Sequence, residues 1–317
     1  MTNIALVGAN FALKGYFPAI KKIKKFNLKI LCRRNQKKKF ENNFKIENNW
    51  RKVFLDKIDL IILAVPPKLQ LKILKHNLYY KKDIIIEKPI SNNYSNSKKI
   101  FDQIKKKKIK IDINLTYINH DLFIKVKEII KNKSLGKVKK FDIFWDFVSQ
   151  DLNKKLITWK TKEKDGGGIK NIFLTHVFSY CQFFFGKMYL KKSFIKKIKI
   201  KNLTFKNYIK CEVNNKKDVN GLIQINTKKR GNQKHWIKIN FELGHIILYT
   251  KSKDWTKNFT LKIFKNNKYT IVKDKTNKDF KDGRSIQIYK MLKNFQKQKK
   301  FSNLNYCLNS EKEIAKI

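Results

Sequence analysis

Apolar and polar positions along the first 120 residues alternate between short runs that are apolar almost throughout and longer amphipathic stretches. The short runs predict strands, and the amphipathic stretches repeat their apolar positions at helical spacing and predict helices. The predicted strands are residues 3–8, 28–33, 59–65, 83–89 and 110–117, and the predicted helices are residues 13–26, 36–44, 68–80 and 93–108. Strands that are apolar on both faces and separated by helices indicate a parallel sheet covered on both sides.

The pattern changes near residue 120. A helix is predicted over residues 121–136, ending on Gly136 as a C-cap. Alternating strand patterns follow, with one helix over residues 169–184 and another over 283–296. The strand patterns are residues 137–148, 193–205, 208–213, 221–227, 235–250 and 261–272. The sequence therefore predicts an α/β Rossmann domain with a parallel sheet at residues 1–119. An α+β domain with a large, mostly antiparallel open sheet is expected to follow at residues 120–317.

The turn after the first strand lies where a dinucleotide-binding fold places a pyrophosphate, at the amino end of the first helix. The usual GxGxxG pattern survives only at Gly8, because Asn10 and Leu13 replace the other two glycines. Asn adopts left-handed conformations readily, and Ala12 takes the small-residue position if the turn is one residue shorter. A plain strand–turn–helix remains the alternative. The predicted cofactor contacts of this turn are Gly8, Ala9, Asn10 and Phe11.

The second strand ends in Cys32-Arg33-Arg34, where NAD-specific folds keep an acid for the adenosine ribose. Two guanidinium groups at this point suit a 2′-phosphate, because Arg pairs bidentately with phosphate oxygens. Arg33 and Arg34 therefore favour NADP over NAD, and NAD stays open as the second choice. The alternative is that they are two more cations in a basic protein.

Taken with DLIILAVPP (residues 59–67) and IIIEKPIS (84–91), this region resembles the Gfo/Idh/MocA oxidoreductase family. The triplet Glu87-Lys88-Pro89 is the most specific short signature, and the resemblance continues through residues 115–145 to the final helix at 303–317. It implies a Rossmann domain and a second domain whose open sheet forms a homo-oligomer, a dimer or a tetramer. The further cofactor contacts that it implies are Ala64, Val65, Pro66, Gln70, Glu87 and Lys88.

The resemblance also implies hydride transfer between a sugar-like alcohol carbon and a nicotinamide. An ammonium group at Lys88 would lower the cost of alkoxide character on the reacting oxygen. His176 matches the proton-handling histidine of the family pattern GGGxLxDxGxHxxD, and imidazole titrates near neutral pH. The pattern departs at Ile172, which replaces an acid four residues before His176, and also at Leu174 and Ser179.

Polar and aromatic residues near the predicted domain boundary and around the glycine triplet are candidates for substrate binding. Tyr180 shares a helix face with His176 and is a candidate to take over part of the missing acid's role. Trp159 and Lys160 stand where the family usually has Trp-Arg. The predicted substrate residues are Asn114, Tyr117, His120, Trp159, Lys160, Asn171 and Tyr180.

Composition adds a strong basic bias that we do not take as a nucleic-acid signal. The chain of 317 residues carries 75 Lys and Arg against 24 Asp and Glu, a formal charge of +51, yet only five of the cations are Arg. Lysine is spread over every region, whereas nucleic-acid readers cluster Arg. No apolar run is long enough for a membrane span, no signal peptide is apparent, and the four cysteines have no metal spacing. A cytoplasmic protein with no membrane partner, no specific nucleic acid and no metal is expected.

These observations predict an NAD(P)-dependent dehydrogenase or reductase acting on a hydroxyl or keto carbon of a sugar or sugar derivative, with Lys88 and His176 as catalytic residues. The first alternative is a catalytically impaired nucleotide- or sugar-binding protein on the same fold, because Ile172 replaces the acid. The second alternative is a basic nucleic-acid-binding protein.

Overall fold

The computed structural model describes the chain except residues 34–43, 201–202, 228–233, 275–278 and 296–301. Arg34 and nearly all of the helix predicted at 36–44 lie outside the described residues. The chain divides into two compact units, Met1–Leu115 with Asp279–Leu308, and Thr116–Lys278 with Asn309–Ile317. The boundary at 119/120 predicted from the sequence assigns residues 279–308 to the second domain, whereas the structure groups them with the first unit.

The first unit contains a six-stranded sheet in the order β3-β2-β1-β4-β5-β6, and every neighbouring pair is parallel. The strands are β1 (Thr2–Gly8), β2 (Phe26–Cys32), β3 (Lys45–Glu47), β4 (Leu60–Ala64), β5 (Asp83–Glu87) and β6 (Ile111–Asn114). This is the strand order of a Rossmann fold, and it confirms the predicted parallel sheet. Because the strands are parallel, their carboxyl ends share one edge, which is where such sheets bind ligands.

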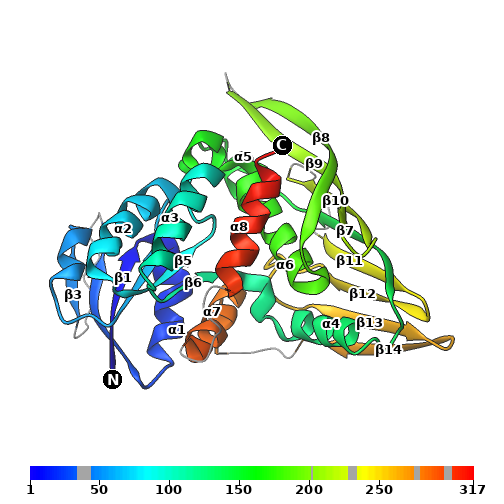
Figure 1. Cartoon of the computed structure of the whole chain (residues 1–317), viewed down its shortest axis with the longest axis horizontal. Coiled ribbons are helices and arrows are strands. Elements are labelled where there is room, and N and C mark those ends of the chain that lie inside the picture. Colours follow the sequence, from blue (N-terminus) through cyan, green and yellow to red (C-terminus); the bar gives the residue numbers. More distant parts are fainter. Residues whose placement is uncertain (34–43, 201–202, 228–233, 275–278, 296–301) are drawn as a thin grey trace. The chain divides into compact units, whose positions relative to one another are not determined.

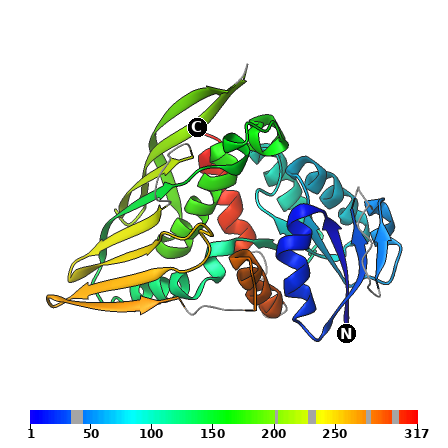
Figure 2. The same cartoon turned by 180° about the vertical axis from the view of Figure 1, so that it is seen from behind.

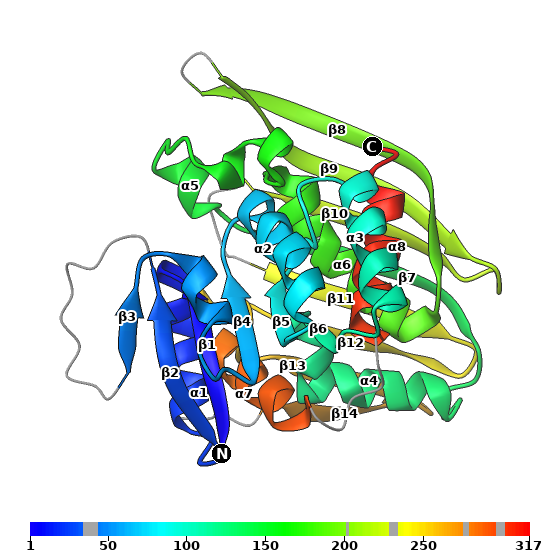
Figure 3. The same ribbon diagram turned by 60° about the vertical axis from the view of Figure 1, so that its left-hand side comes forward.

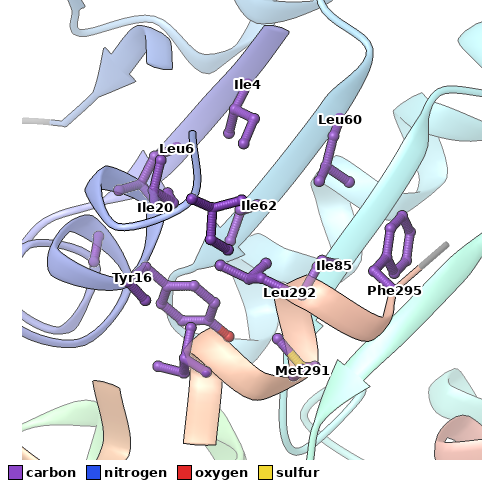
Figure 4. Close-up of a cluster of buried hydrophobic side chains, with 14 of the residues drawn as sticks. Ile4, Leu6, Tyr16, Ile20, Leu60, Ile62, Ile85, Met291, Leu292 and Phe295 are labelled. Carbon is purple, nitrogen blue, oxygen red and sulfur yellow. The ribbon is translucent and has the colours of Figure 1, made fainter. Parts of the chain in front are cut away.

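Helices cover both faces of this sheet. The helices α2 (Pro67–Tyr80) and α3 (Tyr94–Lys106) lie over one face, and α1 (Phe17–Lys21) and α7 (Gly283–Asn294) lie over the other, as Figure 3 shows. A π-helical segment, η1 (Ala12–Tyr16), precedes α1, and the 3₁₀ turn η2 (Trp50–Phe54) precedes β4. Alternate strand residues such as Leu6, Ile62 and Ile85 form one core cluster with Met291 and Leu292 of α7 (Figure 4).

The second unit is built on an eight-stranded sheet in the order β14-β13-β12-β11-β7-β10-β9-β8. Only the β7–β10 pair is parallel, which confirms the mostly antiparallel sheet. The strands are β7 (Val138–Asp146), β8 (Met188–Ile200), β9 (Leu203–Asn215), β10 (Asn220–Asn226), β11 (Lys234–Phe241), β12 (Gly244–Thr250), β13 (Thr260–Lys265) and β14 (Lys268–Lys273).

The helices of this unit gather against one face of its sheet (Figures 1 and 2). They are α4 (Asp121–Lys131), α5 (Gln150–Asn153), the π segment η6 (Lys170–Leu174) with α6 (Thr175–Phe185), and the end of α8 (Ser302–Ile314), besides the 3₁₀ turns η3 (Thr116–Asn119), η4 (Trp159–Thr161) and η5 (Glu163–Asp165). Along β11 the residues alternate between buried and half-buried, so the sheet has one covered face and one open face.

Three expectations about these elements were wrong in detail. The helix α4 ends at Lys131, five residues before Gly136, and Gly136 instead adopts φ +79° in the following turn against Glu242. The strand predicted at 110–117 stops at Asn114, because η3 begins at Thr116. The patterns at 193–205, 235–250 and 261–272 each belong to two antiparallel strands: β8 with β9, β11 with β12, and β13 with β14.

Candidate active site

The turn between β1 and the first helix is closed by Gly8. Its φ is +145°, and a Cβ at this position would lie 2.4 Å from the carbonyl oxygen of Ala64 and 3.1 Å from the Cβ of Ala12. Ala12 therefore fills the small-residue position, as expected for the shorter turn. Asn10 is helical and does not use the left-handed conformation that the sequence suggested. Ala9 and Asn10 are exposed at the helix start, where backbone N–H groups have no intrahelical partner.

Glu87, at the carboxyl end of β5, is held through both its backbone and its side chain. The Gln70 side-chain oxygen accepts from the Glu87 N–H at 3.0 Å, and the Gln70 amide nitrogen lies 2.6 Å from the Glu87 carbonyl. That nitrogen also lies 2.9 Å from the Pro89 carbonyl and 3.0 Å from the Ile90 carbonyl. Gln70 is buried, so the structure gives it the role of fixing the Glu87-Lys88-Pro89 loop, and its predicted cofactor contact stays a prediction.

The Glu87 side chain accepts two hydrogen bonds on one oxygen. The Tyr16 hydroxyl donates to Oε1 at 2.6 Å, and the Asn114 amide donates to the same atom at 2.7 Å. Burial raises the pKa of Glu87, while these two hydrogen bonds and the charges of Lys88 and Arg284 act in the opposite direction. Burial and the neighbouring carboxylate raise the pKa of Tyr16 well above its usual value, so Tyr16 is the proton donor.

Sequence reasoning missed Tyr16, and it predicted the helix at 283–296, now α7, but not that this helix packs in the first unit. Arg284, at the start of α7, makes a two-point contact with Asp282 at 2.9 and 2.6 Å and lies 4.7 Å from the ring centre of Phe11. The Ser285 hydroxyl donates to the carbonyl of Lys14 inside the π segment η1. Only the presence of Arg284, one of five arginines in a lysine-rich chain, signalled this region.

Arg33 lies at the end of β2, at the edge of the sheet where its sequence position predicted it. Its N–H donates to the Glu47 carbonyl at 2.8 Å, and its side chain is buried. The Glu47 side chain contacts Lys45 at 2.9 Å and Lys52 at 3.5 Å. An acid therefore does lie near this strand end, but it comes from β3 and two lysines neutralise it.

The glycine triplet of the second unit forms a close-approach turn. Gly166 and Gly168 have φ +87° and +84°, and a Cβ on Gly167 would lie 2.1 Å from the Trp159 carbonyl oxygen. The Asn171 amide donates to the Gly167 carbonyl at 2.9 Å and ties the turn to the helix that follows. The triplet thus fixes the start of the helix that carries His176.

His176 is half-buried on the first turn of α6, after the π segment η6. Its ring lies edge-on to Tyr117, with the centroids 5.5 Å apart, and 6.4 Å from the ring of Trp145. Residues 168–185 are helical, which confirms the helix predicted at 169–184. Both Ile172 and His176 lie within this helix. Aromatic rings, including those of His235 and Trp255, cluster around this histidine. No sequence motif predicted this cluster.

The two polar residues expected beside His176 are engaged elsewhere in the same unit. The Tyr180 hydroxyl lies 3.0 Å from Nε2 of His235, and the Ser179 hydroxyl lies 3.2 Å from that of Ser310. Both side chains are buried. Burial lowers the pKa of His235 to about 3, so this imidazole is neutral. The expectation that Tyr180 faces the site as a replacement for the acid has no support in these contacts.

Tyr117 and His120, two predicted substrate residues, are also buried. His120 caps α4 by accepting from the Leu122 N–H, and its Nε2 lies 3.3 Å from Asp274. The Tyr117 hydroxyl is 3.5 Å from the Trp255 carbonyl. Trp159 is half-buried, and the exposed Lys160 lies 3.9 Å from Asp151. Substrate contacts by these residues stay predictions.

A group of charged side chains lies beside the glycine turn. Lys206 contacts Glu163 at 3.0 Å and Lys170 contacts the same carboxylate at 3.8 Å. Burial and the Lys206 charge lower the pKa of Lys170, and Glu163 opposes that change. The described residues contain no cluster of three or more His, Cys, Asp or Glu that could hold a metal ion. Among those residues, no helix is long and apolar enough to cross a membrane.

Comparison with known proteins relates both units to one family. The model of the oxidoreductase family GFO_IDH_MocA, NAD-binding Rossmann fold, matches residues 2–115. The model of its C-terminal alpha/beta domain matches residues 127–312.

Curated relatives are distant. The uncharacterized oxidoreductase C115.03 of Schizosaccharomyces pombe is 26% identical over 129 residues, which cover 41% of this chain and only 34% of that protein. The uncharacterized oxidoreductase sll0816 of Synechocystis is 19% identical over 277 residues, covering 82% of this chain and 75% of that protein. This chain therefore spans only about one third of the length of the first of these relatives.

Solved structures share the fold over nearly the whole chain. A levoglucosan dehydrogenase in complex with NADH and levoglucosan has a TM-score of 0.82 at 15% identity, covering 99% of this chain and 96% of the other. KijD10, a 3-ketoreductase from Actinomadura kijaniata in complex with NADP, has a TM-score of 0.77 at 9% identity, covering 100% and 96%. With family models matching both units, the chain belongs to the GFO_IDH_MocA family of oxidoreductases.

Proposed function

We propose that this protein is an NAD(P)-dependent dehydrogenase or reductase that acts on a hydroxyl or keto carbon of a sugar or sugar derivative. The observation that carries the proposal is the fixing of the Glu87-Lys88-Pro89 loop at the carboxyl edge of the Rossmann sheet by Gln70, Tyr16 and Asn114. A loop whose only task was to connect two elements would not need three buried side chains to hold it.

The Gly8 turn fits a dinucleotide. A pyrophosphate needs close approach to a backbone at a helix start, and the absence of a Cβ at Gly8 and the exposure of Ala9 and Asn10 supply it. Beside this turn, Ala64, Val65 and Pro66 at the end of β4 are half-buried and are proposed to contact the nucleotide. Arg33 supports NADP as the preferred form; two solved neighbours are described with NADP and with NADH respectively.

Lys88 and His176 carry separate parts of the proposed chemistry. A bound nicotinamide would supply or accept the hydride. Lys88 donates a hydrogen bond to the reacting oxygen and stabilises its developing negative charge. His176 takes the hydroxyl proton during oxidation or returns it during reduction. Trp159, Lys160 and Asn171 near the glycine turn are the proposed substrate contacts, while the buried Tyr117, His120 and Tyr180 support the aromatic surroundings of His176.

The sugar class is proposed from the neighbours, one of which is described with levoglucosan. The test is nucleotide binding followed by turnover. NADPH should show fluorescence enhancement on binding, more strongly than NADH, and an Arg33→Ala variant should lose that preference. Sugars and nucleotide-linked sugars are then assayed at 340 nm for the parent and for Lys88→Ala and His176→Ala.

We expect each of these two variants to lose a factor of about 10² to 10⁴ in turnover, the range of a positioned acid–base group. The matched controls are Lys72→Ala, at an exposed lysine of α2, and His245→Ala, at a half-exposed histidine of β12. Both should turn over substrate like the parent. Unchanged turnover in Lys88→Ala and His176→Ala would refute the assignment. If neither nucleotide binds, the proposed NAD(P)-dependent activity is refuted.

The second candidate function is a binding protein on the same fold, favoured by one observation: Ile172 replaces the acid beside His176, and Ser179 and Tyr180 are engaged elsewhere. Nucleotide binding without turnover on the whole substrate panel would support it. Specific nucleic-acid binding is not proposed, since the lysines lie in every region. Polyanion binding that persists with sequence preference at about 0.3 M salt would reopen that alternative.

The open face of the eight-stranded sheet supports a homo-oligomer. Trp236 of β11 stands between Phe144 of β7 and Tyr249 of β12 in a row of half-buried aromatic rings. Such a row is typical of a face that a second copy covers. Sedimentation should show a dimer or a tetramer, and Trp236→Glu should shift it towards the monomer. We propose a cytoplasmic location because the four cysteines are buried and have no CxxC or metal-binding spacing.

A further inference from the structure

Tyr16 connects two parts of the first unit that are distant in sequence. It lies at the end of η1, in the helix that follows the Gly8 turn, yet its hydroxyl bonds to Glu87 on β5, with β4 between β1 and β5 in the sheet. Figure 4 shows its ring among the aliphatic side chains of the core, next to α7. The hydroxyl thus joins the proposed pyrophosphate turn to the loop that carries Lys88.

The hydroxyl is not needed to fill the core. Tyr16 is fully buried, and its ring packs edge-on against Phe11 at 5.7 Å between centroids, a contact that a phenylalanine would also make. Burying a phenol against a carboxylate costs desolvation of both groups, and replacing both partners of a buried hydrogen bond by apolar groups of the same shape can be nearly neutral or stabilising. Stability alone therefore does not explain the Tyr16–Glu87 pair.

We propose that Tyr16 is a positioning residue for Lys88. Resting on the proposed function, this inference assigns Tyr16 the task of holding Glu87, together with Asn114, as an oriented carboxylate directly before the reacting lysine. Both donors bind Oε1, at 2.6 and 2.7 Å, and Gln70 fixes the backbone of the same residue. The position and the charge next to Lys88 are then set by three elements: η1, α2 and β6.

Glu87 is the group through which the effect should be measured. The charged and titratable groups that act on it are Tyr16, Lys88 and Arg284, and the charge of Asp112 acts in turn on Tyr16. Burial raises the pKa of Glu87, and the Tyr16 hydrogen bond is the largest influence that opposes it. Removing the hydroxyl should therefore raise this pKa further, so that Glu87 loses its charge at a higher pH than in the parent.

The experiment follows Glu87 directly, without requiring turnover. Carbon-13 NMR of protein labelled at the glutamate side-chain carboxyl, assigned with Glu87→Gln, gives the titration midpoint in the parent, in Tyr16→Phe and in Asn114→Ala. The control Tyr208→Phe removes another tyrosine hydroxyl bond, the one to Gln224 in the second unit. We expect a rise of about one pH unit in both test variants and none in the control.

Kinetics then test the link to Lys88. Turnover by Tyr16→Phe should fall about threefold at a pH midway between the two Glu87 midpoints and approach a tenfold loss below both, the factor that one pK unit represents. It should recover at higher pH. The Kd for NADPH, measured by fluorescence, should stay within about twofold of the parent, because Tyr16→Phe removes only the hydroxyl and keeps the ring that packs against Phe11.

Three results would overturn the proposal. One is a Glu87 midpoint that does not move in either variant, and another is a moved midpoint with parental turnover at every pH. The third is a loss of turnover that no pH restores, which would mean a merely structural role. Failure of the proposed function is recognised separately, because Lys88→Ala would then turn over like the parent while the NMR titration still reports on Tyr16.

Discussion

The two candidate catalytic residues have very different surroundings. Lys88 follows a residue whose backbone and carboxylate are held by four polar contacts, from Gln70, Tyr16 and Asn114. His176 lies among aromatic rings, with Ile172 on its own helix in place of an acid. The first unit thus has a buried polar network beside its candidate lysine, whereas the contacts described for His176 in the second unit are with aromatic rings.

This difference indicates which half of the proposed chemistry is more tightly defined. Hydrogen bonds fix a direction as well as a distance, so Glu87, the residue directly before Lys88, is anchored in one geometry. Aromatic contacts fix the plane of the imidazole, and Ile172 stands where the family pattern has an acid on the same helix. We therefore expect few substitutions around Glu87 and Lys88 to be tolerated. Substitutions around His176, by contrast, should still be able to raise turnover.

The largest effect is expected for Gly8→Ala. The added Cβ would lie 2.4 Å from a backbone oxygen that cannot move cheaply, at a φ of +145°. We expect a loss of about 2–4 kcal/mol of unfolding free energy, from strain together with the collision. NADPH affinity should fall at least 100-fold; thermal denaturation and fluorescence titration measure the two effects.

Gly186→Ala is the matched control for that prediction. Gly186 ends α6 with φ +83°, but a Cβ there would meet no atom within 4 Å. It should cost about 1–2 kcal/mol, the strain of its φ and ψ without the collision. Equal losses in the two variants would show that the close approach to Ala64 does not matter, and intact NADPH binding by Gly8→Ala would contradict the assignment of the turn.

Local pattern was sufficient to predict the Rossmann sheet and most helices, because buried parallel strands and amphipathic helices leave direct traces in sequence. The reversal within residues 193–205 was missed, since alternation continues through it. Candidates for the site could be chosen where a motif exists, at Gly8, Lys88 and His176, and their roles stay predictions. The packing of the site depends on the fold. It was not predictable where long-range packing decides the contact: Tyr16 meets Glu87 across 71 residues, and Tyr180 meets His235 across 55.

Asp112 makes the first unit less stable at high pH. Burial raises its pKa to about 7 from 3.8, so the folded state holds a proton that the unfolded chain has lost. Its contribution to stability is full below pH 3.8 and is lost as the pH rises to about 7. Asp112→Asn should therefore exceed the parent by about 1–3 kcal/mol at pH 8 and equal it at pH 3.5. Urea denaturation tests this; the same difference at both pH values would contradict it.

His235 makes the second unit less stable at low pH. Its pKa of about 3 in the fold lies below the ordinary 6.5, so the unfolded chain takes up a proton that the folded chain does not. Stability should fall as the pH drops from 6.5 towards 3. Between pH 7 and 4.5, His235→Gln should lose about 1–2 kcal/mol less than the parent, although losing the stack on Trp145 lowers its stability at pH 7. His245→Gln, on a half-exposed histidine, should change this pH dependence much less.

The smallest expected effect is also the most direct test of the comparison. Ile172→Asp restores a carboxylate four residues before His176, and Ile172 is half-buried, so the new group can remain hydrated. A charged partner within reach of the imidazole favours its protonated form, which should raise turnover by up to about tenfold and extend activity to higher pH. Ile172→Asn is the control of equal size without charge. If both variants gain equally, polarity alone is responsible. If neither gains while Lys88→Ala is impaired, the histidine half has adapted to work without the acid, and the aromatic rings around His176 are part of that adaptation.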